Sequence, residues 1–291
     1  MNKENQRGVS AALAEGCGYH HYRQDVTPSV DFHSHDYYEF YFFIDGNVTY
    51  CIEEKTFELM SGDVLVIPPG KLHKPYVASN LNYERAVLSV TPELLFSLDK
   101  SHPSLADEIG VICDKGRNLI SLRGKDKEKI TSLLSDIDAE IRLGAKNRFV
   151  AFSAYITVLL INLVRLAKSQ SYHAKGTFIN ESMVPSIIEY INAHLTEPLS
   201  SQSIADAFFI SKYHLQHIFK EYTNVSLYDY ILSKRIIFAK SLIRRGKSLT
   251  DACFACGFKD YSAFYKAFVS KTDMSPKKFK NGLQSIDIFS P

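Results

Sequence analysis

The sequence predicts an α+β protein of two domains: an N-terminal β-barrel with following helices, and a C-terminal domain built only from helices. Two patterns carry this prediction. Short β-branched and aromatic runs occupy residues 19–90, and a pair of short helices is encoded twice after residue 183. The 291 residues are enough to bury two separate cores. The chain is 45% hydrophobic and 23% charged, which is ordinary for a globular protein and argues against disorder.

The strands of the barrel are expected where apolar runs alternate with turn residues. Runs at 39–44, 48–52 and 64–67 are separated by Asp45-Gly46 and Ser61-Gly62, and Pro68-Pro69-Gly70 follows the last run. Many short strands divided by such turns are typical of an all-β sandwich or barrel.

Helices are expected to follow the strands. Thr91 is a good N-cap and Pro92 is tolerated at the first helical position, so a helix should begin there. Apolar positions between 125 and 170 recur at helical spacing and predict two helices. We expect four segments: an effector-sensing barrel domain at 1–120, a helical dimerisation segment at 121–170, a linker at 171–182 and a second domain at 183–285.

The sequence does not predict export or a membrane span. Residues 1–16 lack an apolar core of signal-peptide length. The most apolar stretch, 155–166, is interrupted by Asn162 and Arg165 and is too short to cross a bilayer. Five scattered cysteines, an odd number, fit a reducing compartment. We therefore expect a cytoplasmic protein with no disulfide and no membrane partner.

The C-terminal domain contains a repeated unit of two short helices. In residues 199–219, Ser200 and Ser211 are placed to cap two helices that meet at a tight turn. The arrangement returns at 249–268, where Phe264 and Phe268 occupy the places of Leu215 and Phe219, 49 positions later.

A longer helix should connect the two units. Ser226 is placed to begin it, Asp229 to complete a capping box and Gly246 to end it. Its roughly 19 residues would span roughly 28 Å. That length is close to one turn of B-DNA, roughly 34 Å, so two helices held at its ends would reach successive major-groove segments. A helical array without DNA contact is the alternative interpretation.

The C-terminal domain also carries the excess of basic charge. Residues 183–291 hold 14 Lys and Arg against 9 Asp and Glu, a net charge of +5, whereas the rest of the chain has 20 against 23, or −3. Such an excess of positive charge is expected of a domain that binds a polyanion.

Residues 183–280 resemble the DNA-binding domain of the AraC/XylS family of transcription regulators, from IADAFFISKYHLQHIF through ACFACGFKDYSAFYKAF to Ser275-Pro276. The resemblance implies sequence-specific binding to double-stranded DNA, with RNA polymerase as a further partner.

The resemblance also assigns residues that contact bases in the second helix of each unit. They are Tyr213, Gln216 and His217 in the first unit, and Tyr261, Ser262, Tyr265 and Lys266 in the second. Spacing independently places the first three on one helical face. Gln216 suits a bidentate contact to adenine and Lys266 suits guanine or phosphate, so the first unit should discriminate bases more strongly. Phosphate contacts are expected from Ser211, Lys212, Lys220, Lys259 and Lys271, with an ordinary solvated side chain the equal alternative for each lysine.

A Cys253-x-x-Cys256 pair lies on a predicted helix of the second unit. Structural zinc needs four ligands, and no second pair lies nearby. Core packing is the favoured interpretation of both cysteines.

Two motifs at the barrel resemble those of the cupins. The first is His33-x-His35, then Glu39 and Gly46; the second is Gly62, Pro68-x-Gly70 and His73. Thr27 and Val77 depart from the pattern, at places where Gly and Asn are expected. Regulators of this family often have cupin-like sensing domains, so the resemblance implies a small-molecule effector site.

The carried-over metal positions of the cupins are His33, His35, Glu39 and His73. Three imidazoles and one carboxylate would hold a first-row divalent ion, although regulator cupins commonly keep this motif without a metal. No cofactor is therefore required. Effector binding is expected at His33, His35, Tyr37, Glu39, Tyr41 and His73, where aromatic faces and a few polar groups suit a sugar or another small organic molecule.

The sequence therefore predicts a homodimeric, effector-controlled transcription regulator and not an enzyme. A metal-dependent cupin isomerase or dioxygenase with an attached helical domain is the competing interpretation, and an array that binds only proteins is the third. The C-terminal domain and the absence of acid/base groups beyond the metal positions favour the regulator.

Overall fold

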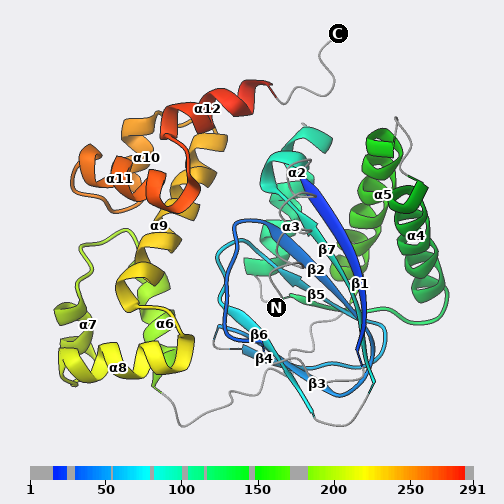
Figure 1. Cartoon of the computed structure of the whole chain (residues 1–291), viewed down its shortest axis with the longest axis horizontal. Helices are drawn as coiled ribbons and strands as arrows, with labels where there is room; N and C mark the ends of the chain where they lie inside the picture. The colour runs from blue at the N-terminus through cyan, green and yellow to red at the C-terminus, as the bar shows by residue number, and fades with distance from the viewer. Residues whose placement is uncertain are drawn as a thin grey trace.

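The computed structural model describes residues 16–24, 30–53, 55–78, 82–99, 104–114, 117–143, 148–170 and 183–285. Within these residues, a β-rich N-terminal domain is followed by a helical C-terminal domain (Figure 1), which confirms the predicted fold class. The predicted linker at 171–182 and Thr27 lie outside the described residues.

The barrel consists of two antiparallel sheets. The larger has the order β1 (Cys17–Gln24), β7 (Tyr83–Val90), β2 (Tyr38–Asp45), β5 (Asp63–Ile67) and β8 (Leu119–Ser121). The smaller has the order β4 (Lys55–Glu58), β3 (Val48–Ile52) and β6 (His73–Val77). The three predicted apolar runs fall on β2, β3 and β5.

Strand β2 shows how the alternation of side chains builds two cores. Phe40 and Phe42 face the helices, whereas Tyr41 and Phe43 face the space between the two sheets. That space is filled, since Tyr41, Tyr50 and the neighbouring aromatic and aliphatic side chains are almost completely buried. The described part of this space is therefore closely packed.

Four helices cover the outer face of the larger sheet: α2 (Pro92–Leu98), α3 (Leu105–Asp114), α4 (Gly124–Leu143) and α5 (Arg148–Ser169). Thr91 caps α2 by accepting a hydrogen bond from the Leu94 amide, with Pro92 at the first position, as predicted.

Helix α5 corrects one expectation from the sequence. Its segment Val150–Ser169 is long and apolar enough to cross a membrane, so the apolar stretch is not too short. The helix nevertheless packs one face into the core of the sensing domain, where Ile156, Leu159, Leu160 and Leu163 are buried. That packing explains its apolar composition.

The C-terminal domain contains seven helices among the described residues: α6 (Val184–Ala193), α7 (Ser201–Ala207), α8 (Lys212–Thr223), α9 (Leu227–Arg244), α10 (Leu249–Ala255), α11 (Tyr261–Thr272) and α12 (Pro276–Ser285). Ser200 and Ser211 cap α7 and α8 as predicted. The 49-residue repeat extends to the helix ends: Thr223 and Thr272 each donate to a carbonyl four residues earlier, and Asn224 and Asp273 each end a helix with positive φ.

The predicted capping box of α9 is only half formed. Ser226 accepts a hydrogen bond from the Asp229 amide, but the Asp229 carboxylate binds the Ser226 hydroxyl and Lys271. The carboxylate thereby joins the start of α9 to the end of α11. Gly246, with φ of +85°, follows the end of α9 as predicted.

Candidate functional site

The second helix of the first unit, α8, separates a buried face from an exposed one. Leu215 and Phe219 are buried in the core, whereas Tyr213, Gln216 and His217 face solvent. Tyr213 is 80% exposed, and its ring lies parallel to that of His217 with centroids 6.4 Å apart. This exposed face presents a phenol, an amide and an imidazole, which can hydrogen-bond to other molecules.

The second helix of the second unit, α11, repeats the arrangement. Phe264 and Phe268 are buried, and the four side chains predicted to contact bases are all exposed: Tyr261, Ser262, Tyr265 and Lys266. Asp260 begins this helix by accepting a hydrogen bond from the Ala263 amide.

The predicted phosphate contacts lie near the ends of these helices. Lys212, Lys220 and Lys259 are exposed. Ser211 is exposed too, but its hydroxyl oxygen accepts from the His214 amide as an N-cap. Lys271 donates to Asp229 at 2.9 Å and so has a partner within the protein.

The histidine cluster lies where the chain before β2 meets the start of β6. His33 and His73 form a backbone bridge, and their rings lie 4.3 Å apart between centroids. His35 Nε2 lies 3.1 Å from the Glu39 carboxylate, and His73 Nε2 lies 3.9 Å from the same oxygen. One ligand atom each from His35, Glu39 and His73 lies within 4.8 Å of the others. Of the four predicted metal positions, His33 lies at the edge of this group.

All three imidazoles have the same ring nitrogen engaged. The Nδ1 atoms of His33, His35 and His73 lie 2.9, 2.9 and 2.7 Å from backbone carbonyl oxygens. Since a carbonyl only accepts, each Nδ1 donates, and the Nε2 atoms of His35 and His73 are the ones that lie near Glu39. The Nε2 atom of His73 is buried without a hydrogen-bond partner among the described residues. Oriented imidazoles of this kind are typical of metal ligands.

The charges of the cluster suit a cation. Burial opposes ionisation of Glu39, but the hydrogen bond from His35 and the imidazoles around it outweigh burial and lower the pKa of the carboxyl to about 2. Burial lowers the pKa of His73 to about 3, so this imidazole is neutral at neutral pH. An ionised carboxylate beside a neutral, lone-pair-bearing imidazole fits a divalent metal ion.

Aromatic residues surround the cluster at different depths. Tyr37 stacks on His35 with centroids 3.7 Å apart and is partly exposed. Tyr50, which was not among the predicted site residues, is buried and donates to Glu39 at 3.4 Å. Tyr41 lies deeper, and its hydroxyl shares a hydrogen bond with that of Tyr83. The predicted effector residues are therefore brought together, except that Tyr41 belongs to the packed interior.

A cavity of about 310 Å³ lies on the other side of the larger sheet, against α4. Tyr19, Phe42 and Leu134 contribute apolar walls, and Glu84, Thr131 and Asp138 contribute polar groups. Its volume is at the lower end of the range for small-molecule sites. No local sequence pattern indicates this cavity, since its walls come from four strands and a helix far apart in the chain.

Cys253 and Cys256 are part of the core of the second unit, as predicted. Both are buried beside Phe264 and Phe268. Burial raises the pKa of both thiols, that of Cys256 to about 12, so neither is a ready thiolate ligand.

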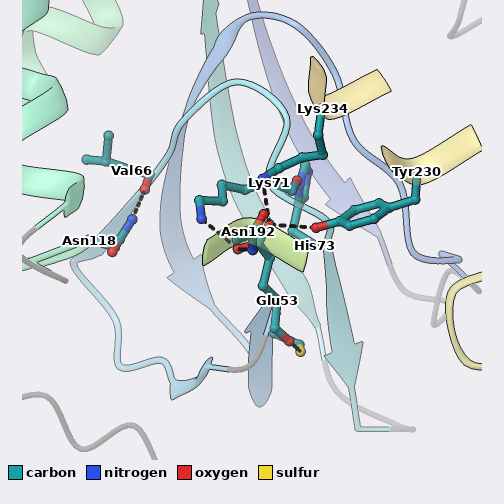
Figure 2. A network of polar contacts seen from close by, with 9 residues as sticks. Glu53, Val66, Lys71, His73, Asn118, Asn192, Tyr230 and Lys234 are labelled. Atoms are coloured by element: carbon teal, nitrogen blue, oxygen red, sulfur yellow. Dashed lines mark hydrogen bonds and ion pairs between the residues drawn. The ribbon is translucent and has the colours of Figure 1, made fainter. Parts of the chain in front are cut away.

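A buried carboxylate, Glu53, joins the barrel to the C-terminal domain (Figure 2). It is 2% exposed and accepts hydrogen bonds from Lys71 of the barrel, Asn192 of α6, and Tyr230 and Lys234 of α9, at 2.6 to 3.1 Å. Burial opposes its ionisation, but Lys234 and Lys71 outweigh burial and lower the pKa of the carboxyl. Sequence reasoning missed this residue.

Comparisons with known proteins agree with both domains. A model of the AraC-like ligand binding domain matches residues 17–143, and a model of a helix-turn-helix domain matches residues 204–282. The HTH-type transcriptional activator RhaR of Mannheimia succiniciproducens is 21% identical and aligns over 89% of this chain and 90% of its own length. The uncharacterized HTH-type transcriptional regulator YijO of Escherichia coli is 27% identical over 78% and 76% of the two chains. The structure of ToxT from Vibrio cholerae O395 covers 94% of this chain and 100% of its own, with 16% identity and a TM-score of 0.36.

Proposed function

Since the chain belongs to the AraC family of transcription regulators, we propose that it reads DNA with α8 and α11 under the control of a small molecule that binds its sensing domain. The observation that carries the DNA-reading role is the shared geometry of the two helices. Each buries two apolar residues and exposes polar and aromatic ones, and α9, 18 residues long, separates the two units. At about 1.5 Å per residue α9 spans roughly 27 Å, close to one turn of B-DNA.

DNA binding by the full-length protein tests this role. Gln216→Ala should lower the preference for the specific site over scrambled DNA, because it removes a base contact. Lys212→Ala should weaken binding to both DNAs alike and reduce the salt dependence of the affinity, because a phosphate contact carries no sequence information. Fluorescence anisotropy at several salt concentrations measures both effects. Identical losses on specific and scrambled DNA for the two variants would contradict this division of roles.

We also propose that the histidine cluster holds a first-row divalent metal ion. Glu39 and the Nε2 atoms of His35 and His73 would bind it, with His33 as a fourth ligand from the edge of the cluster. The orphaned Nε2 of His73 and the three Nδ1–carbonyl contacts support this assignment. A bound ion would supply a Lewis-acid centre for an oxygen-bearing effector, such as a sugar, stacked near Tyr37.

Metal content of protein purified without chelators tests this site. We expect close to one equivalent by elemental analysis, and loss of the ion in Glu39→Gln. Lys168→Met is the control and should retain the ion, since it removes an ion pair with Glu108 between α5 and α3. Protein without stoichiometric metal would contradict the proposal.

The cavity against α4 is a second candidate for an organic effector. Thr131→Trp should fill it, whereas His33→Ala alters only the cluster. If an effector changes DNA affinity through the cavity, Thr131→Trp abolishes the response and His33→Ala leaves it intact. The reverse pattern places the effector at the cluster. Measurements of DNA affinity with and without candidate effectors separate the two.

We further propose that the protein is a cytoplasmic homodimer that recruits RNA polymerase. Exposed apolar residues on α4 and α5, namely Ile141, Leu143, Val150 and Val158, support a dimer contact through these helices. Light scattering of the wild type and of Val150→Glu tests it, with a shift to monomer expected for the variant.

A further inference from the structure

The segment before β2 carries both metal-site residues and contacts to the C-terminal domain. Phe32 precedes His33 and stacks on Tyr222 of α8, with ring centroids 5.1 Å apart. Asp36 follows His35, and its carboxylate accepts a hydrogen bond from Lys240 of α9. Each predicted ligand of this segment is therefore next to a residue that holds the DNA-binding domain.

The segment before β6 has the same double role. A Cβ on Gly70 would lie 2.8 Å from Ile237 Cδ1 of α9, so the backbone here approaches the helix closely. Leu72 is buried in one core with the first helix-turn-helix unit. His73 follows directly, and its backbone pairs with His33 at 2.9 and 3.2 Å. The two segments are thus tied together and meet α8 and α9 jointly.

Glu53 connects the segment before β6 to α9 (Figure 2). Its amide donates to the Leu72 carbonyl at 2.7 Å, next to His73. Its carboxylate binds Tyr230 and Lys234 of α9, both at 3.0 Å. Its φ of +52° is unfavourable for a residue with a side chain, and its buried contacts hold it there. We name the contacts of Phe32, Asp36, Gly70 and Glu53 with the C-terminal domain the docking contacts.

We propose that metal binding at His35, Glu39 and His73 and docking of the DNA-binding domain stabilise each other. The inference rests on the metal site proposed above and adds what the ion regulates. In the docked arrangement the three ligands already converge, so an ion favours that arrangement over any in which the two segments shift. By linkage, undocking of the DNA-binding domain must weaken metal binding by the same factor as removal of the metal weakens docking. The divalent ion is then itself an effector of domain docking.

Zn²⁺ affinity of full-length variants tests the linkage. Lys240→Met removes the pair with Asp36 and the ammonium over the Phe279 ring, and it keeps an unbranched side chain of similar length. Tyr222→Ala removes the stack on Phe32 without changing charge. Competition with a chromophoric chelator should show Zn²⁺ binding at least about fivefold weaker in both, the lower end of typical coupling. Lys168→Met is the matched control and should bind Zn²⁺ like the wild type.

The direction of the effect in Lys240→Met separates linkage from simple electrostatics. Removing a lysine near the cluster should strengthen binding of a cation if charge alone acts. Linkage predicts weaker binding instead. Unchanged or tighter Zn²⁺ binding in both Lys240→Met and Tyr222→Ala would overturn the proposal.

Hydrogen exchange provides a second readout that does not depend on the interface variants folding well. Zn²⁺ should slow amide exchange along α9 in the wild type and have no such effect in Glu39→Gln. If the wild type takes up no Zn²⁺, the metal site and this inference both fail, while DNA binding still stands on its own test. If it takes up one equivalent and α9 exchange does not change, only the linkage fails.

Discussion

The two helix-turn-helix units have matching helices, but their cores pack against different parts of the molecule. The core of the first unit includes Phe32, Cys51 and Leu72 of the barrel. In the part of the chain that the structure describes, the buried core of the second unit, from Ile236 to Phe279, is made of residues of the C-terminal domain. Among the described residues, the N-terminal domain reaches the later part of α9 at Gly70, which lies close to Ile237, and through ion pairs of Lys240 with Asp36 and of Arg244 with Glu93. A change in the barrel should therefore reach the first unit directly and the second one through α9.

The units also differ at the turn between their two helices. The first unit places Phe209 there, with φ of +55° and 96% exposure, and the second places Gly257, with φ of +89°. A side chain at positive φ costs about 1–2 kcal/mol. The first unit therefore keeps a strained aromatic residue exposed at its turn, whereas the second has the residue that suits the backbone.

The largest expected effect comes from Glu53→Gln, which would weaken the contacts between the barrel and the first unit. The change leaves Lys234 and Lys71 beside an uncharged amide, and we expect about 3 kcal/mol of lost stability in α6 to α8. Hydrogen exchange should show faster exchange there and unchanged exchange in α10 to α12. Glu108→Gln, which breaks the more exposed pair with Lys168, should cost less than about 1 kcal/mol. An equal loss of stability in both units would show that both depend on the contacts of Glu53.

A smaller effect is expected at the turns. Gly257→Ala should lower the free energy of unfolding by about 2 kcal/mol, because its Cβ would lie 3.0 Å from the carbonyl oxygens of Leu195 and Thr196 at a positive φ. Phe209→Gly should change it by less than about 1 kcal/mol, since relief of strain offsets the added freedom of the unfolded chain. Urea denaturation measures both. A larger loss for Phe209→Gly would mean that its exposed ring contributes to stability.

The smallest effect concerns base discrimination. Gln216→Ala in the first unit should reduce selectivity for the preferred base pair by about 1–2 kcal/mol, roughly tenfold. Ser262→Ala in the second unit should reduce it less, because a hydroxyl reads bases less selectively than an amide. Binding to a panel of sites with single base changes compares the two. Greater selectivity loss from Ser262→Ala would reverse the proposed ranking of the units.

Periodicity was enough to predict α8 and α11 and the faces that they bury. The 49-residue spacing of Leu215 and Phe219 with Phe264 and Phe268 fixed which faces are buried, and the exposed faces followed. The cupin-like motifs likewise brought His35, Glu39 and His73 together, because strand pairing fixes the register of their neighbours.

Contacts between the domains could not be predicted in this way. Glu53 and Lys234 lie 181 positions apart, and neither belongs to a local pattern. An Asp or Glu in a turn usually faces solvent, so only the tertiary structure shows that Glu53 is buried. The cavity against α4 was missed for the same reason. The membrane-spanning length of the apolar segment in α5 was not predicted, because Asn162 and Arg165 interrupt the stretch 155–166.

Selection of genomic DNA fragments by the full-length protein tests most directly whether two unequal helix-turn-helix units read DNA. We predict enriched fragments that share two short sequence elements with centres about 10 base pairs apart, one helical turn. The element read by the first unit should vary less among the fragments. Fragments without a common sequence, or with a single element, would contradict the account.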